Sequence, residues 1–226
     1  MTLSLLAALA AAASGCRARR AAERTPAPAA TADTFTRAVQ AYLDRRGDLC
    51  VGRPTWPIDV PEGARLGPDV VQLPVLERLG VVTSTVLPER RAGVATPFNL
   101  RRYRLTAEGR KRYIDRETRL PVAPEDPPAG ARADFCVLSL ALGKVTRWEV
   151  QPGATPTATV SYTYTVDAPA WVRDPGFQRV FPAVARLVAG AGTAELVEGF
   201  TLAPAGWTAN ELLPGTTVPG EATAAR

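Results

Sequence analysis

The chain has 226 residues, and 46% of them are hydrophobic, which is enough for a packed core in one domain or two small ones. Its formal net charge is +5, carried almost wholly by arginine, and abundant Arg, Ala and Pro are typical of a GC-rich genome. The arginine content is therefore weak evidence for nucleic-acid binding. The chain has no histidine, which removes the commonest general base, the commonest metal ligand and the Ser-His-Asp triad. We therefore predict no catalytic site, no cofactor and no metal site.

The N-terminal residues carry the clearest signal in the chain. Residues 3–13 are an unbroken run of Leu, Ala and one Ser. This run is too short to cross the hydrocarbon core of a membrane, which takes about 20 apolar residues. A short apolar run at the N-terminus, followed by small residues, is typical of a signal peptide. We therefore predict a signal peptide over residues 1–15.

The small residues Ala13-Ser14-Gly15 are followed directly by Cys16. This pattern resembles the lipobox of bacterial envelope lipoproteins, whose cysteine is lipidated on its thiol and becomes the mature N-terminus. The resemblance implies lipid attachment at Cys16, with the membrane as a partner through acyl chains. Arg17, where retained lipoproteins carry Asp, implies the outer membrane, facing the periplasm. The alternative is an ordinary secretory signal peptide followed by a chance cysteine.

Two further cysteines, Cys50 and Cys136, remain if Cys16 is lipidated. An even pair in an oxidising compartment is typical of a disulfide. We therefore predict a Cys50–Cys136 disulfide, and the alternative is two buried free thiols. Before them, residues 16–32 are rich in Arg, Ala and Pro without apolar periodicity, and we interpret this segment as a flexible tether.

Local patterns in the first half of the chain predict an α+β unit, a helix with a β-hairpin, over residues 33–120. Apolar residues at positions 35, 38, 39, 42 and 43 follow the spacing of one helical face, and we expect Asp33 to cap that helix. A proline-broken loop follows a short buried strand, and we expect Trp56 to pack inward from this loop. The expected elements are a helix at 34–46, a strand at 49–51, a loop at 54–61, a helix at 70–79, strands at 81–87 and 98–105, and a helix at 107–114 that follows Thr106 as its cap.

Residues 70–114 also resemble, locally, the wing of winged-helix regulators. The resemblance rests on Leu76-Glu-Arg-Leu-Gly-Val-Val82 and Tyr103-Arg-Leu-Thr-Ala-Glu-Gly-Arg110. It implies a basic wing suited to phosphate contacts. An envelope protein meets no genome, so nucleic-acid binding is the alternative and holds only if the signal peptide is misread. The basic residues on or near the implied wing are Arg90, Arg91, Arg101, Arg102, Arg104, Arg110 and Lys111.

A proline-rich segment, residues 121–132, is the best candidate for a linker. A second α+β unit is expected over residues 133–213, an antiparallel sheet with a packed helix. Residues 157–166 alternate between apolar and hydroxyl side chains, which predicts a half-buried strand. Asp174-Pro175 predicts the start of a helical region that Pro182 splits. Further strands are expected at 135–142, 145–150 and 195–202, and a disordered tail at 214–226.

Catalysis without histidine needs paired carboxylates or a Ser-Lys pair. The carboxylate pairs Asp115/Glu117 and Glu125/Asp126 are interpreted as solvated, and Lys144 lies near Ser139 only along the sequence. We therefore expect the protein not to be an enzyme. The leading hypothesis is a membrane-anchored envelope lipoprotein that acts as a non-catalytic binding or accessory module. A nucleic-acid-binding winged helix and a histidine-free hydrolase are the alternatives.

Overall fold

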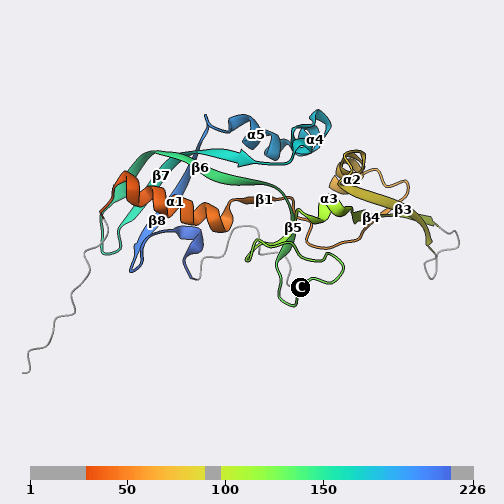
Figure 1. Ribbon diagram of the computed structural model, residues 1–226, viewed down its shortest axis with the longest axis horizontal. Helices are drawn as coiled ribbons and strands as arrows, with labels where there is room; N and C mark the ends of the chain where they lie inside the picture. Colours follow the sequence, from red (N-terminus) through yellow and green to blue (C-terminus); the bar gives the residue numbers. More distant parts are fainter. Residues whose placement is uncertain (1–28, 90–97, 215–226) are drawn as a thin grey trace, which may run out of the picture.

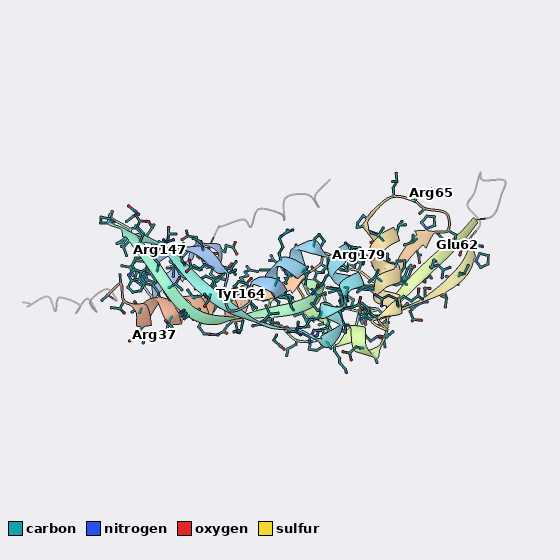
Figure 2. The ribbon with its side chains drawn as sticks, turned by 90° about the horizontal axis from the view of Figure 1, so that it is seen from above. Arg37, Glu62, Arg65, Arg147, Tyr164 and Arg179 are labelled. Carbon is teal, nitrogen blue, oxygen red and sulfur yellow. A yellow bond between two sulfur atoms is a disulfide. The ribbon has the colours of Figure 1, made fainter. Side chains whose placement is uncertain are left out.

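The computed structural model describes residues 29–89 and 98–214. It confirms the expected α+β class, with two antiparallel sheets and helices that pack against them. The elements form an elongated body, with the long strands of the larger sheet towards one end and the smaller sheet at the other (Figure 1). The view from above places Arg37 and Arg147 near the first end and Glu62 and Arg65 at the second (Figure 2).

The larger sheet, sheet A, is built around one long hairpin. Its strand order is β1-β6-β7-β8-β9, and β5 also pairs with β6. The two strands predicted at 135–142 and 145–150 are one continuous strand, β6, because two irregularities in its pairing with β7 absorb the residues between them. The strands are β1 (Asp48–Cys50), β5 (Tyr113–Asp115), β6 (Ala133–Gln151), β7 (Thr157–Asp167), β8 (Glu195–Ala203) and β9 (Gly206–Ala209).

The alternating pattern in β7 predicted one buried face and one exposed face, and only part of the strand has this arrangement. Ala158, Val160 and Tyr162 are buried in a core that α1 (Ala32–Arg46) shares with sheet A. The hydroxyl side of the strand is exposed at its two ends. Ser161 and Thr163 are nevertheless buried. Alternation identified which side chains share a face, but not that both faces are covered.

Helix α1 begins earlier than expected, and its cap is Thr31, so the prediction of Asp33 as the cap was wrong. The Thr31 side chain accepts a hydrogen bond from the Thr34 N–H, and the Thr34 hydroxyl oxygen accepts one from the Thr31 N–H. This reciprocal arrangement satisfies two backbone donors, whereas Asp33 lies within the first turn. The helix packs against β6 and β9, and β1 pairs with β6, so residues 32–50 belong with the sheet expected in the second half of the chain.

Gly47 lies where the end of α1 meets β6. Its φ of −72° suits any residue, so the requirement for glycine is steric. A Cβ atom there would lie 2.5 Å from the Leu43 carbonyl oxygen and 2.7 Å from that of Leu140. Both atoms belong to backbone that is itself hydrogen-bonded into the fold, and the Leu140 N–H donates to the Gly47 carbonyl at 2.8 Å. The helix can therefore approach the strand this closely only at glycine.

We expect Gly47→Ala to lower the free energy of unfolding by about 2 kcal/mol, because backbone must move to admit the methyl group. Urea denaturation measures the change. Gly153→Ala is the matched control, since the nearest atom to its Cβ is 3.8 Å away, and it should change stability by less than about 0.5 kcal/mol. Equal effects of the two substitutions would show that the close approach does not matter.

The smaller sheet, sheet B, has the strand order β2-β4-β3. The segment expected to be a proline-broken loop contains β2, although Trp56 packs inward as expected and is 6% exposed. The helix expected at 107–114 ends at Arg110, because residues 113–115 instead pair with β6 and are fully covered. The elements are β2 (Ile58–Pro61), α2 (Pro68–Arg78), β3 (Val82–Glu89), β4 (Phe98–Leu105) and α3 (Ala107–Arg110), which Thr106 caps as expected.

Strand β3 is one of the two edge strands of sheet B, and β2 is the other. The carboxylate of Glu77, in α2, accepts hydrogen bonds from the Ser84 backbone N–H at 2.9 Å and from the Ser84 hydroxyl at 2.7 Å. Pro88, two alternations further along the strand, has no N–H to offer. One outward donor of this edge is therefore covered by a side chain, and another is absent.

The helices of the C-terminal half begin where the local sequence predicts. Asp174 caps α4 (Pro175–Val180), and Pro182 starts a separate helix, α5 (Pro182–Gly190), as predicted. Two short 3-10 helices complete the fold, η1 (Ala170–Arg173) and η2 (Asn210–Leu212). In Figure 1, α4 and α5 are drawn on the opposite side of β6 and β7 from α1.

A single hydrophobic core joins residues on both sides of the proline-rich segment 121–132. Leu73 and Leu76 of α2 are fully buried in the same cluster as Phe135 of β6 and Phe177 of α4. The ion pair between Arg78 and Asp174, at 2.7 Å, links α2 to the cap of α4. The parts of the chain expected to form two units therefore share their packing.

Candidate functional site

The two cysteines that were predicted to form a disulfide lie side by side in the structure. Cys50 and Cys136 are partners in the pairing of β1 with β6, and a disulfide joins them, as predicted. Cys16, the expected site of lipid attachment, lies outside the described residues, as do the signal peptide and most of the tether. The tail after residue 214 lies outside them too.

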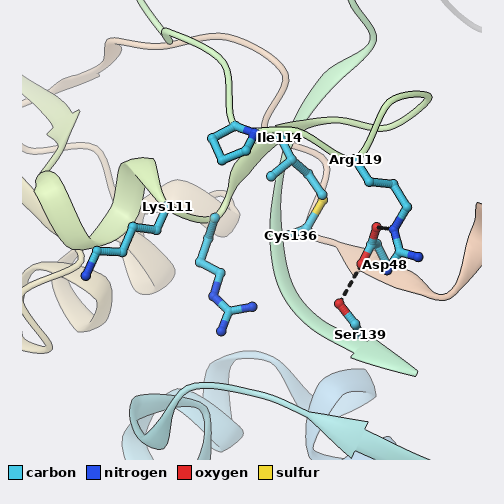
Figure 3. Close-up of a pocket in the computed structure, with 8 residues that line it drawn as sticks. Asp48, Lys111, Ile114, Arg119, Cys136 and Ser139 are labelled. Atoms are coloured by element: carbon cyan, nitrogen blue, oxygen red, sulfur yellow. Dashed lines mark hydrogen bonds and ion pairs between the residues drawn. The ribbon is translucent and has the colours of Figure 1, made fainter. Parts of the chain in front are cut away.

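A pocket of about 190 Å³ opens beside this disulfide. It lies where β1 and β5 both meet the first part of β6. Figure 3 shows Asp48, Arg119 and Ser139 together on one side of the pocket and Lys111 on the other. The side chains around the pocket combine three cations, one carboxylate and one hydroxyl with a small apolar wall. The lining residues are Asp48, Lys111, Arg112, Ile114, Arg119, Pro121, Cys136 and Ser139.

On one side of the pocket the carboxylate of Asp48 is fully partnered. The Arg119 guanidinium donates to both of its oxygens, from Nε at 2.5 Å and from Nη2 at 2.8 Å. The Ser139 hydroxyl donates to Oδ1 at 2.5 Å. The hydrogen bond with Asp48 holds the pKa of the Arg119 guanidinium above its ordinary value. This side of the pocket therefore carries an electrically neutral ion pair, in which both Arg119 and Ser139 fix the position of the Asp48 carboxylate.

The backbone of Arg119 is unusual. Its φ is 60°, in the left-handed region that costs a non-glycine residue about 1–2 kcal/mol. The turn before it is fixed by Asp115, whose carboxylate accepts from the backbone N–H groups of Glu117 and Thr118. Those backbone hydrogen bonds lower the pKa of Asp115, although burial opposes them. Arg119 also donates to the Asp44 carbonyl at 2.7 Å, so the strained turn delivers one guanidinium to β1 and to the end of α1.

On the other side, two cations follow α3 directly. Lys111 forms an exposed ion pair with Glu108 at 2.7 Å, and that hydrogen bond lowers the pKa of Glu108. The Arg112 side chain makes no ion pair within residues 29–89 and 98–214. Its backbone, by contrast, is fixed, because its carbonyl accepts from the Cys136 N–H at 2.8 Å. The Arg112 charge also helps to lower the pKa of Glu108, so that carboxylate acts on both cations, and the lining still holds more cations than carboxylates.

The basic residues of the implied wing are largely neutralised by acidic partners. Arg102 forms a bidentate pair with Asp59, and its hydrogen bonds lower the pKa of that carboxyl. Three more cations make ion pairs, so a phosphate would have to displace a carboxylate at each of them. Arg90 and Arg91 lie outside the described residues. The further ion pairs are Arg101–Glu62, Arg110–Glu125 and Lys111–Glu108.

The candidates for histidine-free chemistry do not converge. Ser139 donates to Asp48, not to Lys144, and Asp115 fixes a turn. Among the described residues, no three His, Cys, Asp or Glu side chains gather closely enough to hold a metal ion. No helix in the same part of the chain has both the length and the apolar composition to cross a membrane.

A second polar cluster lies between α1 and sheet A. The Tyr42 hydroxyl donates to Glu211 at 3.2 Å, and burial raises the pKa of the neighbouring Glu198 carboxyl. Burial and these two carboxylates also raise the pKa of the Tyr42 and Tyr162 hydroxyls. The cluster joins α1 to β8 and η2, so its polar groups serve the packing of the helix.

Of the residues that line this pocket, the sequence analysis named Cys136 for the disulfide, Lys111 for the implied wing and Ser139 for a Ser-Lys pair, but it did not bring them together. Asp48 stands beside a predicted strand, and nothing local distinguishes Arg112 or Arg119 from the other arginines. Only their long-range partners single them out. No protein-family model matches the chain, and neither a curated protein nor a solved structure is found to match it.

Proposed function

We propose that the protein is a membrane-anchored lipoprotein of the bacterial envelope that acts as a non-catalytic binding or accessory module. Cys16 carries the lipid, and the folded part faces the periplasm from the outer membrane. The observation that carries the proposal is the sequence Ala13-Ser14-Gly15-Cys16 at the end of the apolar run 3–13. The Cys50–Cys136 disulfide supports it, because disulfides persist in oxidising compartments outside the cytosol.

The chemistry of lipid anchoring is sufficient for a stable attachment. Each CH₂ group that enters the membrane contributes about 0.8 kcal/mol, and one acyl chain alone anchors a protein only marginally. Two or more chains on one cysteine make the attachment lasting. The pocket supports the non-catalytic part of the proposal, because its carboxylate and its hydroxyl are engaged with each other and with Arg119.

We expect Cys16→Ser to abolish palmitate labelling and to release the protein from the membrane fraction, because the serine hydroxyl cannot replace the thiol that accepts the lipid. The measurement is metabolic labelling of a producing bacterium, followed by fractionation with a high-salt wash. Globomycin should cause the unprocessed form of the unaltered protein to accumulate.

Ser14→Ala is the matched control, because it keeps a small residue beside the cleavage site and leaves the thiol in place. It should be labelled and should sediment like the unaltered protein. The proposal fails if Cys16→Ser still sediments with membranes as the unaltered protein does, or if residues 1–15 remain on the mature chain.

A further inference from the structure

The pocket beside the disulfide has the size of a site for one compact group. Its volume is about 190 Å³. Pockets for drug-sized ligands start at about 300 Å³. The pocket therefore suits a single charged group of a few atoms, and the rest of a larger ligand would extend into solvent.

The charges around the pocket select the sign of that group. Asp48 is neutralised by Arg119, and Lys111 is paired with Glu108 at the surface. Arg112 makes no ion pair within 4 Å in the described ranges, although its charge also acts on Glu108, and the lining keeps more cations than carboxylates. A guanidinium presents its donors in a planar fork that matches the oxygens of a carboxylate or a phosphate.

The backbone that carries this guanidinium is fixed before any ligand arrives. The Arg112 N–H donates to the Gly109 carbonyl at 3.0 Å, and its carbonyl accepts from Cys136, which the disulfide ties to β1. On the opposite wall, Asp48 and Arg119 hold each other in place with Ser139. A site built on rigid backbone loses little conformational entropy when it binds.

We propose that this pocket binds one compact oxyanion, the phosphate or carboxylate group of a small molecule or of a lipid headgroup, through Arg112 with support from Lys111. The inference specifies the ligand of the proposed binding module and rests on that proposal. Its direct contact is the Arg112 guanidinium, and the neutral Asp48–Arg119 pair forms the far wall. Lys111 lies beside Arg112 in the lining and adds to the positive potential, although Glu108 partly neutralises it.

The test is an NMR titration of the full-length protein in detergent micelles with sodium phosphate and sodium acetate at constant ionic strength. We expect saturable shifts of the amide signals of Arg112, Ile114 and Ser139, with a dissociation constant in roughly the millimolar range. Arg112→Gln should weaken binding about tenfold or more. The matched control is Arg116→Gln, which removes the same charge from an exposed residue outside the lining and should change affinity by less than about twofold.

Vesicles distinguish the source of the oxyanion. Binding to phosphatidylglycerol vesicles that depends on Arg112 assigns the site to a lipid headgroup, and binding of the free ions alone assigns it to a soluble molecule. Shifts that never saturate, or equal weakening by the two glutamine variants, overturn the proposal. If Arg112→Gln fails to fold, the unaltered protein provides the test. Amide shifts that are not confined to the residues around the pocket then overturn the proposal. Loss of palmitate labelling would remove the anchor without affecting this result.

Discussion

Replacing both Cys50 and Cys136 by alanine is expected to lower the free energy of unfolding by about 4 to 5 kcal/mol. The two residues are 86 positions apart, so the bond removes many extended conformations from the unfolded chain. Alanine at both positions leaves no free thiol in the fold, and Cys136 is only 3% exposed. Denaturation in guanidinium chloride measures the change.

Reduction of the unaltered protein provides the comparison. Dithiothreitol should lower its stability by a similar amount and should leave the double alanine variant unchanged. A loss below about 1 kcal/mol in both experiments would show that the bond does not constrain the unfolded chain. The oxyanion affinity should also fall in the double variant, because the strand whose Cys136 N–H holds the Arg112 carbonyl is then no longer tied covalently to β1.

The second large effect is expected at Arg53, a charged residue that is only 7% exposed. Its guanidinium donates to Asp69 and, at 2.6 Å, to the side-chain oxygen of Gln72. The Gln72 amide in turn donates to the Val180 carbonyl at 3.1 Å. The backbone N–H of Arg53 donates to the buried carboxylate of Asp134 at 2.6 Å. One residue therefore links α2, α4 and β6.

We expect Asp69→Asn to lower the free energy of unfolding by about 3 kcal/mol, because it leaves the buried guanidinium with neutral partners only. Urea denaturation measures the change. The carboxylate of Asp69 is itself 39% exposed, so the cost arises at the arginine. Adding Arg53→Met to Asp69→Asn should restore most of the stability, since an apolar side chain of similar length needs no counter-charge.

Asp59→Asn is the matched control for this experiment. It breaks the Arg102–Asp59 pair, whose side chains are 32% and 33% exposed, and pairs of this kind contribute at most about 1 kcal/mol. If Asp69→Asn lowers the free energy of unfolding no more than Asp59→Asn does, the burial of Arg53 does not make its ion pair more important for stability than an exposed pair.

The elements set by short-range chemistry were predictable from the sequence. Asp174-Pro175 and Pro182 fix their helix starts through a cap and through a missing N–H, and these need no distant partner. Thr106 caps α3 in the same way. The alternation of β7 identified a strand, because the period of two is a property of the strand itself.

Features set by distant partners were not predictable. The apolar face of α1 is evident in the sequence, but periodicity does not say that β6 and β9 cover it. Residues 113 and 114 were expected to end a helix and instead belong to β5, because pairing with β6 outweighs a weak local preference. The pocket depends on Arg119 reaching Asp48 across 71 positions, and no local pattern marks such a pair.

The edge of β3 bears on how neighbouring copies behave. A strand that offers a full row of outward N–H groups can recruit another chain and start aggregation. Here Glu77 occupies the donor of Ser84, and Pro88 has none. Two outward positions of β3 therefore offer no free donor, and we expect this edge to recruit a second chain less readily than a strand with a full row of N–H groups.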